Sequence, residues 1–242
     1  MYGLPGQSLH GALADVDAAL NHQVGHLSHY ELTIEPNTLF HRFPPERPDE
    51  DAIWAMHREC LTRIEAAGLQ RYEISAYARP GAESRHNLNY WQFGDYLGVG
   101  AGAHGKLTDP GRGLVERSLK HRHPRRYLAG DGGRTARRWA VAEADLPLEF
   151  MLNAARLLAG FSEGLFESRT GVTLEAIGEP LERAVARGLV ERSEGLIRPT
   201  ARGTQFLNEY LLLFQAPLAV AGSTADGMKR APVDTGAEPP ML

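Results

Sequence analysis

The chain of 242 residues is long enough for one large domain or two smaller ones with a sizeable buried core. Its apolar fraction of 43% and net charge of -4 are ordinary for a globular protein, so bulk charge indicates no partner. No apolar run reaches the length of a membrane span and no basic-then-apolar leader begins the chain, so a cytoplasmic location is expected. Cys60 is the only cysteine, which excludes an internal disulfide and cannot by itself hold a metal cluster.

The N-terminal residues predict a βαβ unit, the building block of parallel sheets and α/β barrels. Residues 3–6 are typical of the end of a strand, and Ser8 is placed to cap a helix. Alternation over residues 27–34 predicts the next strand, which Glu35 and Pro36 end. The helix between them has one apolar face, formed by Leu9, Leu13, Val16 and Leu20.

A second helix is expected between Asp49 or Asp51 and Gly68, followed by strands over 72–77 and 96–99. Its apolar face is Ile53, Met56, Cys60 and Ile64, so Cys60 is expected to be a buried, inert thiol. The loops that start at Glu35, Ala78 and Gly100 are expected to open on the same side of the sheet, where α/β barrels carry their sites.

Residues 86–105, HNLNYWQFGDYLGVGAGAHG, have the composition of a ligand site. Glycines allow backbone to approach a bound group closely, although a tight turn after a buried strand explains the glycines equally well. Gly100, Gly102 and Gly105 also spell the glycine spacing of a dinucleotide-binding loop. We reject that interpretation, because the turn-rich run after Gly105 is not typical of the helix that such a loop requires.

The segment His86–Trp91 followed by GVGAGAHG, together with residues 2–7 and 27–38, resembles the radical-SAM heme chaperones of the HemW family. These are relatives of oxygen-independent coproporphyrinogen III oxidase. The resemblance covers residues 1 to about 215. It implies an α/β fold, with the C-terminal part of a TIM-like, partial radical-SAM barrel over residues 1–115. It also implies a [4Fe-4S] cluster, S-adenosylmethionine, and binding of heme for delivery to acceptor proteins.

The cluster-binding loop of that family, Cys-x-x-x-Cys-x-x-Cys, is missing here. The chain is therefore expected to be the C-terminal portion of a longer protein, without the cluster-binding cysteines. No catalytic residue is assigned. By the resemblance, Thr33 and His104 align with positions that approach S-adenosylmethionine.

His86 is the candidate heme-iron ligand, and Tyr90 and Trp91 are candidates for the apolar wall of a heme site. The alternative is that His86 hydrogen-bonds a loop while Tyr90 and Trp91 pack in the core. His121 and His123 are further candidate ligands. They lie near three arginines that could pair with heme propionates, Arg122, Arg125 and Arg126.

Residues 116–144 are expected to be a basic connecting segment. Between residues 117 and 138 there are eight Lys or Arg residues and one acid, Asp131. Such a field attracts porphyrin carboxylates or nucleic acid, but a solvated surface is the preferred interpretation.

Residues 145–215 predict a winged-helix-like domain: helices over 148–159 and 174–185, a hairpin turning at Glu194–Gly195, and a helix over 200–214. That pattern allows a nucleic-acid-binding module. The acidic residues Glu175, Glu179 and Glu182 oppose it, because they would face phosphates. Residues 216–242 have no apolar periodicity and are expected to be a disordered tail.

Three functions follow from these features. The first is a heme chaperone, a carrier more than a catalyst, whose partners are heme and heme-acceptor proteins. The second is the oxidase that decarboxylates propionate side chains in porphyrin biosynthesis. The third is winged-helix binding of nucleic acid, which the basic run and residues 145–214 alone would allow. The HNLNYW motif and the GAHG ending favour the first.

Overall fold

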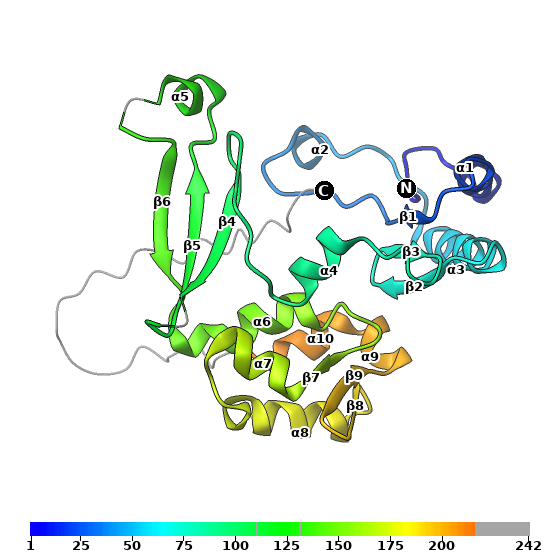
Figure 1. Ribbon diagram of the computed structural model, residues 1–242. Coiled ribbons are helices and arrows are strands. Elements are labelled where there is room, and N and C mark those ends of the chain that lie inside the picture. The colour runs from blue at the N-terminus through cyan, green and yellow to red at the C-terminus, as the bar shows by residue number, and fades with distance from the viewer. Residues whose placement is uncertain (110, 131, 216–242) are drawn as a thin grey trace, which may run out of the picture.

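The computed structural model describes residues 1–109, 111–130 and 132–215, so the predicted tail at 216–242 lies outside the described residues. Within them, the strands form sheets of three strands each, ordered β1-β3-β2, β4-β5-β6 and β7-β9-β8. Figure 1 shows the first sheet with α1 and α3 on one side of the molecule, the second sheet on the other side, and the third within a helical domain below them.

The βαβ unit predicted at the N-terminus is reduced to a single parallel bridge between residues on either side of a helix. Tyr2 pairs in parallel with Glu31, and α1 (Leu9–Asn21) lies between them. Ser8 Oγ accepts a hydrogen bond from Gly11 N–H at 3.1 Å, which satisfies one of the free donors of the first turn. The strand predicted over residues 27–34 is shorter, because regular pairing is confined to β1 (His26–Ser28) and the bridge at Glu31.

The second predicted helix is confirmed as α3 (Glu50–Ala66), which Asp49 caps. It follows the short helix α2 (Leu39–Arg42) and buries Ile53, Met56, Cys60 and Ile64. Gly68 ends the segment with φ of +84°, a conformation that glycine adopts without strain. Cys60 is fully buried, which confirms the predicted burial, and burial raises the pKa of its thiol, in the direction that an inert thiol requires.

The single strand predicted over residues 72–77 is wrong. The chain reverses at residues 74–75, so that β2 (Gln70–Glu73) and β3 (Ala76–Ala78) form an antiparallel hairpin. Arg71 stabilises this turn by donating from Nε to the Ile74 carbonyl at 3.1 Å. Since β3 is also antiparallel to β1, the C-terminal ends of these two strands point in opposite directions. The loops that follow them therefore do not open on the same side of the sheet, as had been predicted for the loops at Glu35 and Ala78.

The HNLNYW motif forms a helix, α4 (Arg85–Trp91). The strand predicted over residues 96–99 is reduced to a bridge between Tyr96 and Lys106. Beyond it, β4 (His104–Asp109), β5 (Leu114–Lys120) and β6 (Thr135–Ala140) form an antiparallel meander with α5 (Pro124–Ala129) at its tip. The basic stretch expected as a connecting segment therefore contributes the end of β5, the helix α5 and the strand β6, and the boundary predicted after residue 115 falls inside β5.

The C-terminal elements alternate helices with short strands. The hairpin predicted at Glu194–Gly195 is confirmed, and both turn residues have positive φ, 51° and 75°. The helix predicted over residues 200–214 is interrupted at Phe206. The elements are η1 (Glu143–Asp145), α6 (Leu146–Ala154), β7 (Phe161–Ser162), α7 (Glu163–Thr170), η2 (Leu174–Ile177), α8 (Gly178–Ala186), β8 (Val190–Ser193), β9 (Leu196–Pro199), α9 (Ala201–Gln205) and α10 (Leu207–Leu212).

Two apolar cores hold these elements together. One extends from Tyr2 to Tyr77 and joins α1, α3 and the first sheet. The other extends from Phe93 to Phe214, and through Val115 it fixes the foot of the second sheet to the C-terminal domain. In the sequence, the HNLNYW helix α4 follows the last residue of the first core and precedes the first residue of the second.

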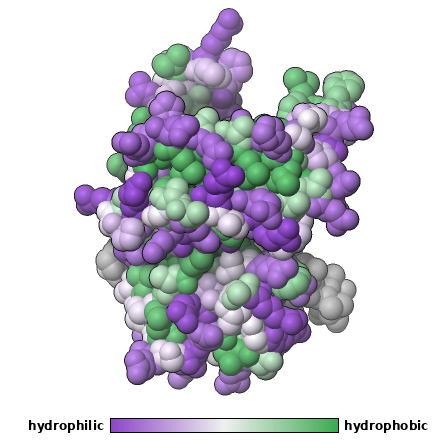
Figure 2. All heavy atoms as spheres, turned by 90° about the vertical axis from the view of Figure 1, so that its right-hand side faces the viewer, coloured by the Kyte–Doolittle hydropathy of each residue, from purple (hydrophilic) through white to green (hydrophobic). Residues whose placement is uncertain are grey.

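Large apolar side chains are also exposed on the N-terminal half, among them Leu39, Phe43 and Trp54. Figure 2 shows hydrophobic residues over the upper part of one face, interspersed with hydrophilic ones. Among the described helices, none is both long enough and apolar enough to cross a membrane.

Candidate functional site

The start of α4 is fixed by two polar side chains. Ser84 Oγ accepts from Asn87 N–H at 3.3 Å and caps the helix. Asn87 is buried, and its Nδ2 donates to the Tyr72 hydroxyl at 3.3 Å. That hydroxyl lies 2.9 Å from His26 Nε2, so the HNLNYW helix is tied to both β2 and β1.

The end of α4 depends on the second amide of the motif. Asn89 Nδ2 donates to the Asp95 carbonyl at 3.0 Å, and the Asn89 carbonyl accepts from Gly94 N–H at 2.7 Å. A β-carbon on Gly94 would lie 2.1 Å from Asn89 Oδ1, so only glycine fits there. The two asparagines of the motif therefore position the helix.

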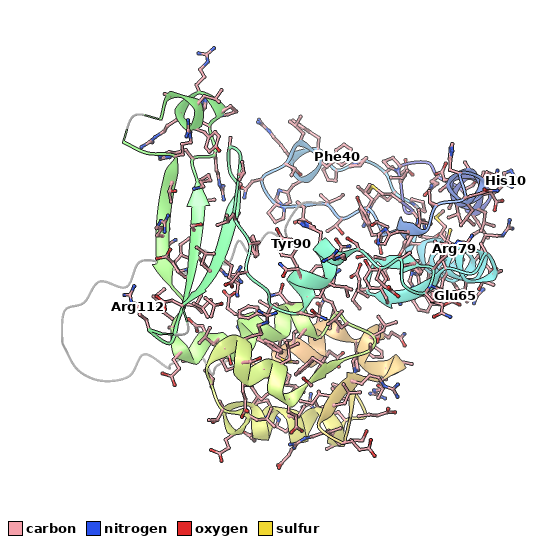
Figure 3. The ribbon with its side chains drawn as sticks, viewed as in Figure 1. His10, Phe40, Glu65, Arg79, Tyr90 and Arg112 are labelled. Carbon is pink, nitrogen blue, oxygen red and sulfur yellow. The ribbon has the colours of Figure 1, made fainter. Side chains whose placement is uncertain are left out.

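Three aromatic rings follow one another on the side of α4 that faces the second sheet. His86 and Tyr90 are one helical turn apart, with ring centroids at 4.8 Å, and Tyr90 lies 4.4 Å from Tyr96. Burial raises the pKa of both tyrosines, so their phenols are protonated at neutral pH. The His86 side is exposed, and Figure 3 labels Tyr90 between the second sheet and the N-terminal elements.

Trp91 lies on a different side of α4, because adjacent helical residues point about 100° apart. Arg156 lies over its ring, 4.4 Å from the centroid, and also donates to Glu73 and Ser75. In the described part of the chain, the buried Trp91 Nε1 has no hydrogen-bond partner. The two residues predicted as a heme wall lie apart: Tyr90 adjoins His86, whereas Trp91 is half-buried at the junction with the C-terminal domain and belongs to neither apolar core.

A buried cation connects β4 to the segment that follows α4. Lys106 is 1% exposed, and its Nζ donates to the Phe93 carbonyl, Asp95 Oδ1 and Thr108 Oγ1 at 3.0, 2.9 and 3.1 Å. Burial lowers the pKa of Lys106. Burial alone would raise the pKa of Asp95, but its hydrogen bonds to Lys106 and Thr108 outweigh that effect and lower it.

The glycine-rich loop returns the chain into β4. A β-carbon on Gly98 would lie 2.2 Å from the His104 carbonyl oxygen, so the close approach requires glycine. Gly100 N–H donates to the Tyr127 hydroxyl at 3.0 Å, which joins the loop to α5. Gly105 lies inside β4 and not at the start of a helix, unlike the third glycine of a dinucleotide-binding loop.

The other predicted site residues lie in separate places. Thr33 is exposed beyond the Tyr2–Glu31 bridge, and His104 is exposed at the start of β4. His121 follows β5, where its carbonyl accepts from Gly102 N–H at 3.0 Å. His123 is the exposed N-cap residue of α5, next to the arginines at 122, 125 and 126.

The chain does not fit a [4Fe-4S] cluster by itself. Such a cluster requires several thiolates, and the single thiol of this sequence, Cys60, lies on the buried face of α3. No group of three His, Cys, Asp or Glu side chains suited to a metal ion occurs in the described ranges.

Comparison with known proteins shows which family the chain resembles. Residues 141–206 match the HemN C-terminal domain. The chain is 45% identical over 216 residues to the heme chaperone HemW of Escherichia coli, covering 89% of this chain and 56% of that protein. Over 89% of its length, the chain is therefore similar to a member of the HemW family.

Other relatives agree with this similarity to HemW. Heme chaperone HemW of Bacillus subtilis is 31% identical over 227 residues, covering 90% of this chain and 58% of that protein. The solved structure of the radical-SAM enzyme coproporphyrinogen III oxidase (HemN) from Escherichia coli superimposes with a TM-score of 0.69 at 16% identity, covering 90% of this chain and 54% of that one. This likeness supports the α/β fold. The chain spans a little over half the length of the relatives it matches.

Several residues of the site were not found from the HemW-like sequence. Tyr96 and Lys106 follow the motif within 20 residues, and a lone lysine directly after GAHG is the signal that was available. No sequence signal pointed to the pair of Glu73 and Arg156, because the two residues are 83 positions apart and meet only through tertiary packing.

Proposed function

We propose that this chain is the heme-binding part of a heme chaperone of the radical-SAM family, which binds heme and passes it to acceptor proteins. The identity of 45% to a protein named heme chaperone HemW carries the proposal. The helix α4 supports it, because His86 is exposed at the start of a helix that the buried Asn87 and the half-buried Asn89 hold in place.

In this proposal His86 is the heme-iron ligand. A neutral imidazole nitrogen binds heme iron well, and His86 lies one helical turn from Tyr90. The Tyr90 and Tyr96 rings, which contact each other at a tilt of 50°, supply aromatic surface beside it, against which a porphyrin can pack. Tyr96 replaces Trp91 in this role, since Trp91 is engaged by Arg156.

The complete protein is proposed to hold a [4Fe-4S] cluster and S-adenosylmethionine, as the radical-SAM family implies. The cluster needs thiolates beyond the one in this sequence. Thr33 and His104 remain the proposed contacts to S-adenosylmethionine, and their exposure is compatible with that role. When bound, these groups supply radical chemistry.

The finer architecture is part of the same proposal. Residues 1–115 would belong to a partial barrel, which the parallel pairing of Tyr2 with Glu31 around α1 supports. Residues 145–215 would form a winged-helix-like cover, supported by the hairpin β8-β9 after α8. Nucleic-acid binding is not favoured, since Glu175, Glu179 and Glu182 are exposed on η2 and α8. We place the protein in the cytoplasm.

The chaperone is preferred to the oxidase because the relatives at 31 to 45% identity cited above carry the chaperone name. The likeness to the oxidase structure is limited to 16% identity.

The experiment is a hemin titration of the 242-residue chain, followed by the Soret band. His86→Ala is expected to weaken hemin binding at least tenfold. His10→Ala is the matched control, because His10 is exposed on α1, far from Tyr90 in Figure 3. Equal hemin affinity in the two variants would remove His86 from the site.

A further inference from the structure

The second sheet has one face that continues the aromatic row of α4. In antiparallel strands, residues directly opposite each other point to the same face. The register pairs Lys106 with Arg117 and Arg117 with Trp139, and the bridge adds Tyr96 opposite Lys106. These four residues form one row across the sheet.

The next row towards α5 is more exposed. It consists of His104, Leu119 and Arg137, which are paired in the same way. Leu119 is half-buried, and His104 and Arg137 are exposed. On the other side of the Lys106 row lies Val115, which is buried in the C-terminal core. The face therefore changes from buried at its foot to open towards α5.

The contacts confirm that these residues share a face next to the candidate heme site. Arg117 Nη1 donates to the Tyr96 hydroxyl at 2.9 Å, and Tyr96 packs against Tyr90 of α4. The Arg137 guanidinium lies over the Trp139 ring, 4.6 Å from its centroid. The face thus combines flat aromatic surface with guanidinium groups.

Its charge is positive. No acidic residue lies in these two rows, and Arg117 is paired with Glu149 of α6, whereas Arg137 has no ion pair within the described ranges. The opposite face is different, because Arg138 there is paired with Glu116 at 2.8 Å. Among the described residues of these two rows, Arg137 is consequently the arginine or lysine whose charge is available to a ligand.

The geometry points to this face, with Tyr96, Leu119, Trp139 and Arg137, as the second wall of the ligand site, occupied by a carboxylate-bearing tetrapyrrole. This inference rests on the proposed function. Tyr96 and Trp139 stand at the two ends of the row, three strand spacings or roughly 14 Å apart, with Lys106 and Arg117 between them, so a flat macrocycle would lie across the row and not within it. Arg137 would bind a carboxylate at the edge of the ring through charged hydrogen bonds.

The test compares hemin with hemin dimethyl ester, which lacks the carboxylate charges, in titrations of the 242-residue chain. Arg137→Gln is expected to weaken hemin binding about tenfold and to change binding of the ester less than twofold. Arg138→Gln is the matched control on the opposite face and should leave both affinities unchanged. The circular dichroism and melting temperature of both variants should match those of the wild type.

Two results would overturn the inference. If the wild-type chain binds hemin but Arg137→Gln binds it equally well, or if Arg137→Gln and Arg138→Gln weaken it equally, this face is not the carboxylate site and the proposed function stands. If the wild-type chain does not bind hemin at all, the proposed function fails together with the inference.

Discussion

Arg156 joins the two halves of the molecule: its Nη2 lies 3.2 Å from Oε2 of Glu73, whose side chain is 2% exposed. The same guanidinium lies over Trp91 of the HNLNYW helix. A buried carboxylate that loses its cation, or a cation that loses its carboxylate, is strongly destabilising. Trp91 therefore belongs to the junction between the N-terminal elements and the C-terminal domain. His86 and Tyr90 lie together on another side of α4, where His86 is exposed.

We predict that Glu73→Ala lowers the free energy of unfolding by about 3 kcal/mol, because it leaves Arg156 without its carboxylate. Urea unfolding measures this change. The control is Glu191→Ala, which removes an exposed partner of Arg198 and should cost less than about 1 kcal/mol. Equal losses in the two variants would show that the junction carries no special stability.

Lys106→Met is predicted to cost about 2 kcal/mol of unfolding free energy and to weaken hemin binding. The variant removes three hydrogen bonds that hold Phe93, Asp95 and Thr108 together at the end of α4. Lys120→Met removes a single bond to Thr135 and should cost at most about 1 kcal/mol. Unchanged stability and hemin affinity in Lys106→Met would contradict the positioning role.

Gly94→Ala is predicted to destabilise the chain by about 2 kcal/mol, because the new β-carbon would overlap Asn89 at the end of α4. Thermal or urea unfolding detects the change. Gly164→Ala in α7 is the control, since its β-carbon meets open space and alanine favours helix. If both variants were as stable as the wild type, Asn89 would not be held as described.

His29 predicts a pH dependence of stability. Burial lowers its pKa from 6.5 to about 4, so the unfolded chain binds this proton more readily than the folded chain. The contribution of the neutral, buried His29 to the free energy of unfolding is complete above pH 6.5 and is lost as the pH falls towards 4. Relative to His29→Gln, the wild type should lose on the order of 2 kcal/mol between about pH 7 and 5. Parallel stability curves for the two proteins would refute this assignment.

Some elements could be predicted because their local sequence signals agree with their tertiary packing. These include the helix α3 and the hairpin β8-β9. Ile53, Met56, Cys60 and Ile64 recur at helical spacing and are buried. Glu194 and Gly195 adopt the positive φ that a two-residue hairpin requires. In these segments the apolar period and the turn residues determine the local structure.

The second sheet could not be predicted in the same way. β6 has the sequence TARRWA and is exposed over most of its length, so it has no apolar alternation. Its register alone brings Arg137 and Trp139 onto the face of Tyr96, and register depends on pairing with β5. The hairpin at residues 74–75 was missed because its turn contains neither glycine nor asparagine.

Within the candidate site, the HNLNYW motif indicated which segment carries the site. It did not predict the directions in which the side chains of that segment point. His86 and Tyr90 were expected together and lie together. Tyr90 and Trp91 were expected to form one wall but diverge, since a helix separates adjacent residues. The helical assignment of HNLNYW would have revealed this, and Ser84 was the capping signal for it.

The central claim is that this chain carries the heme-binding surface of a heme chaperone. A titration of the wild-type 242-residue chain with hemin tests it most directly. The account predicts saturation at about one hemin per chain with a shifted Soret band. A spectrum that remains that of free hemin at every ratio would contradict it.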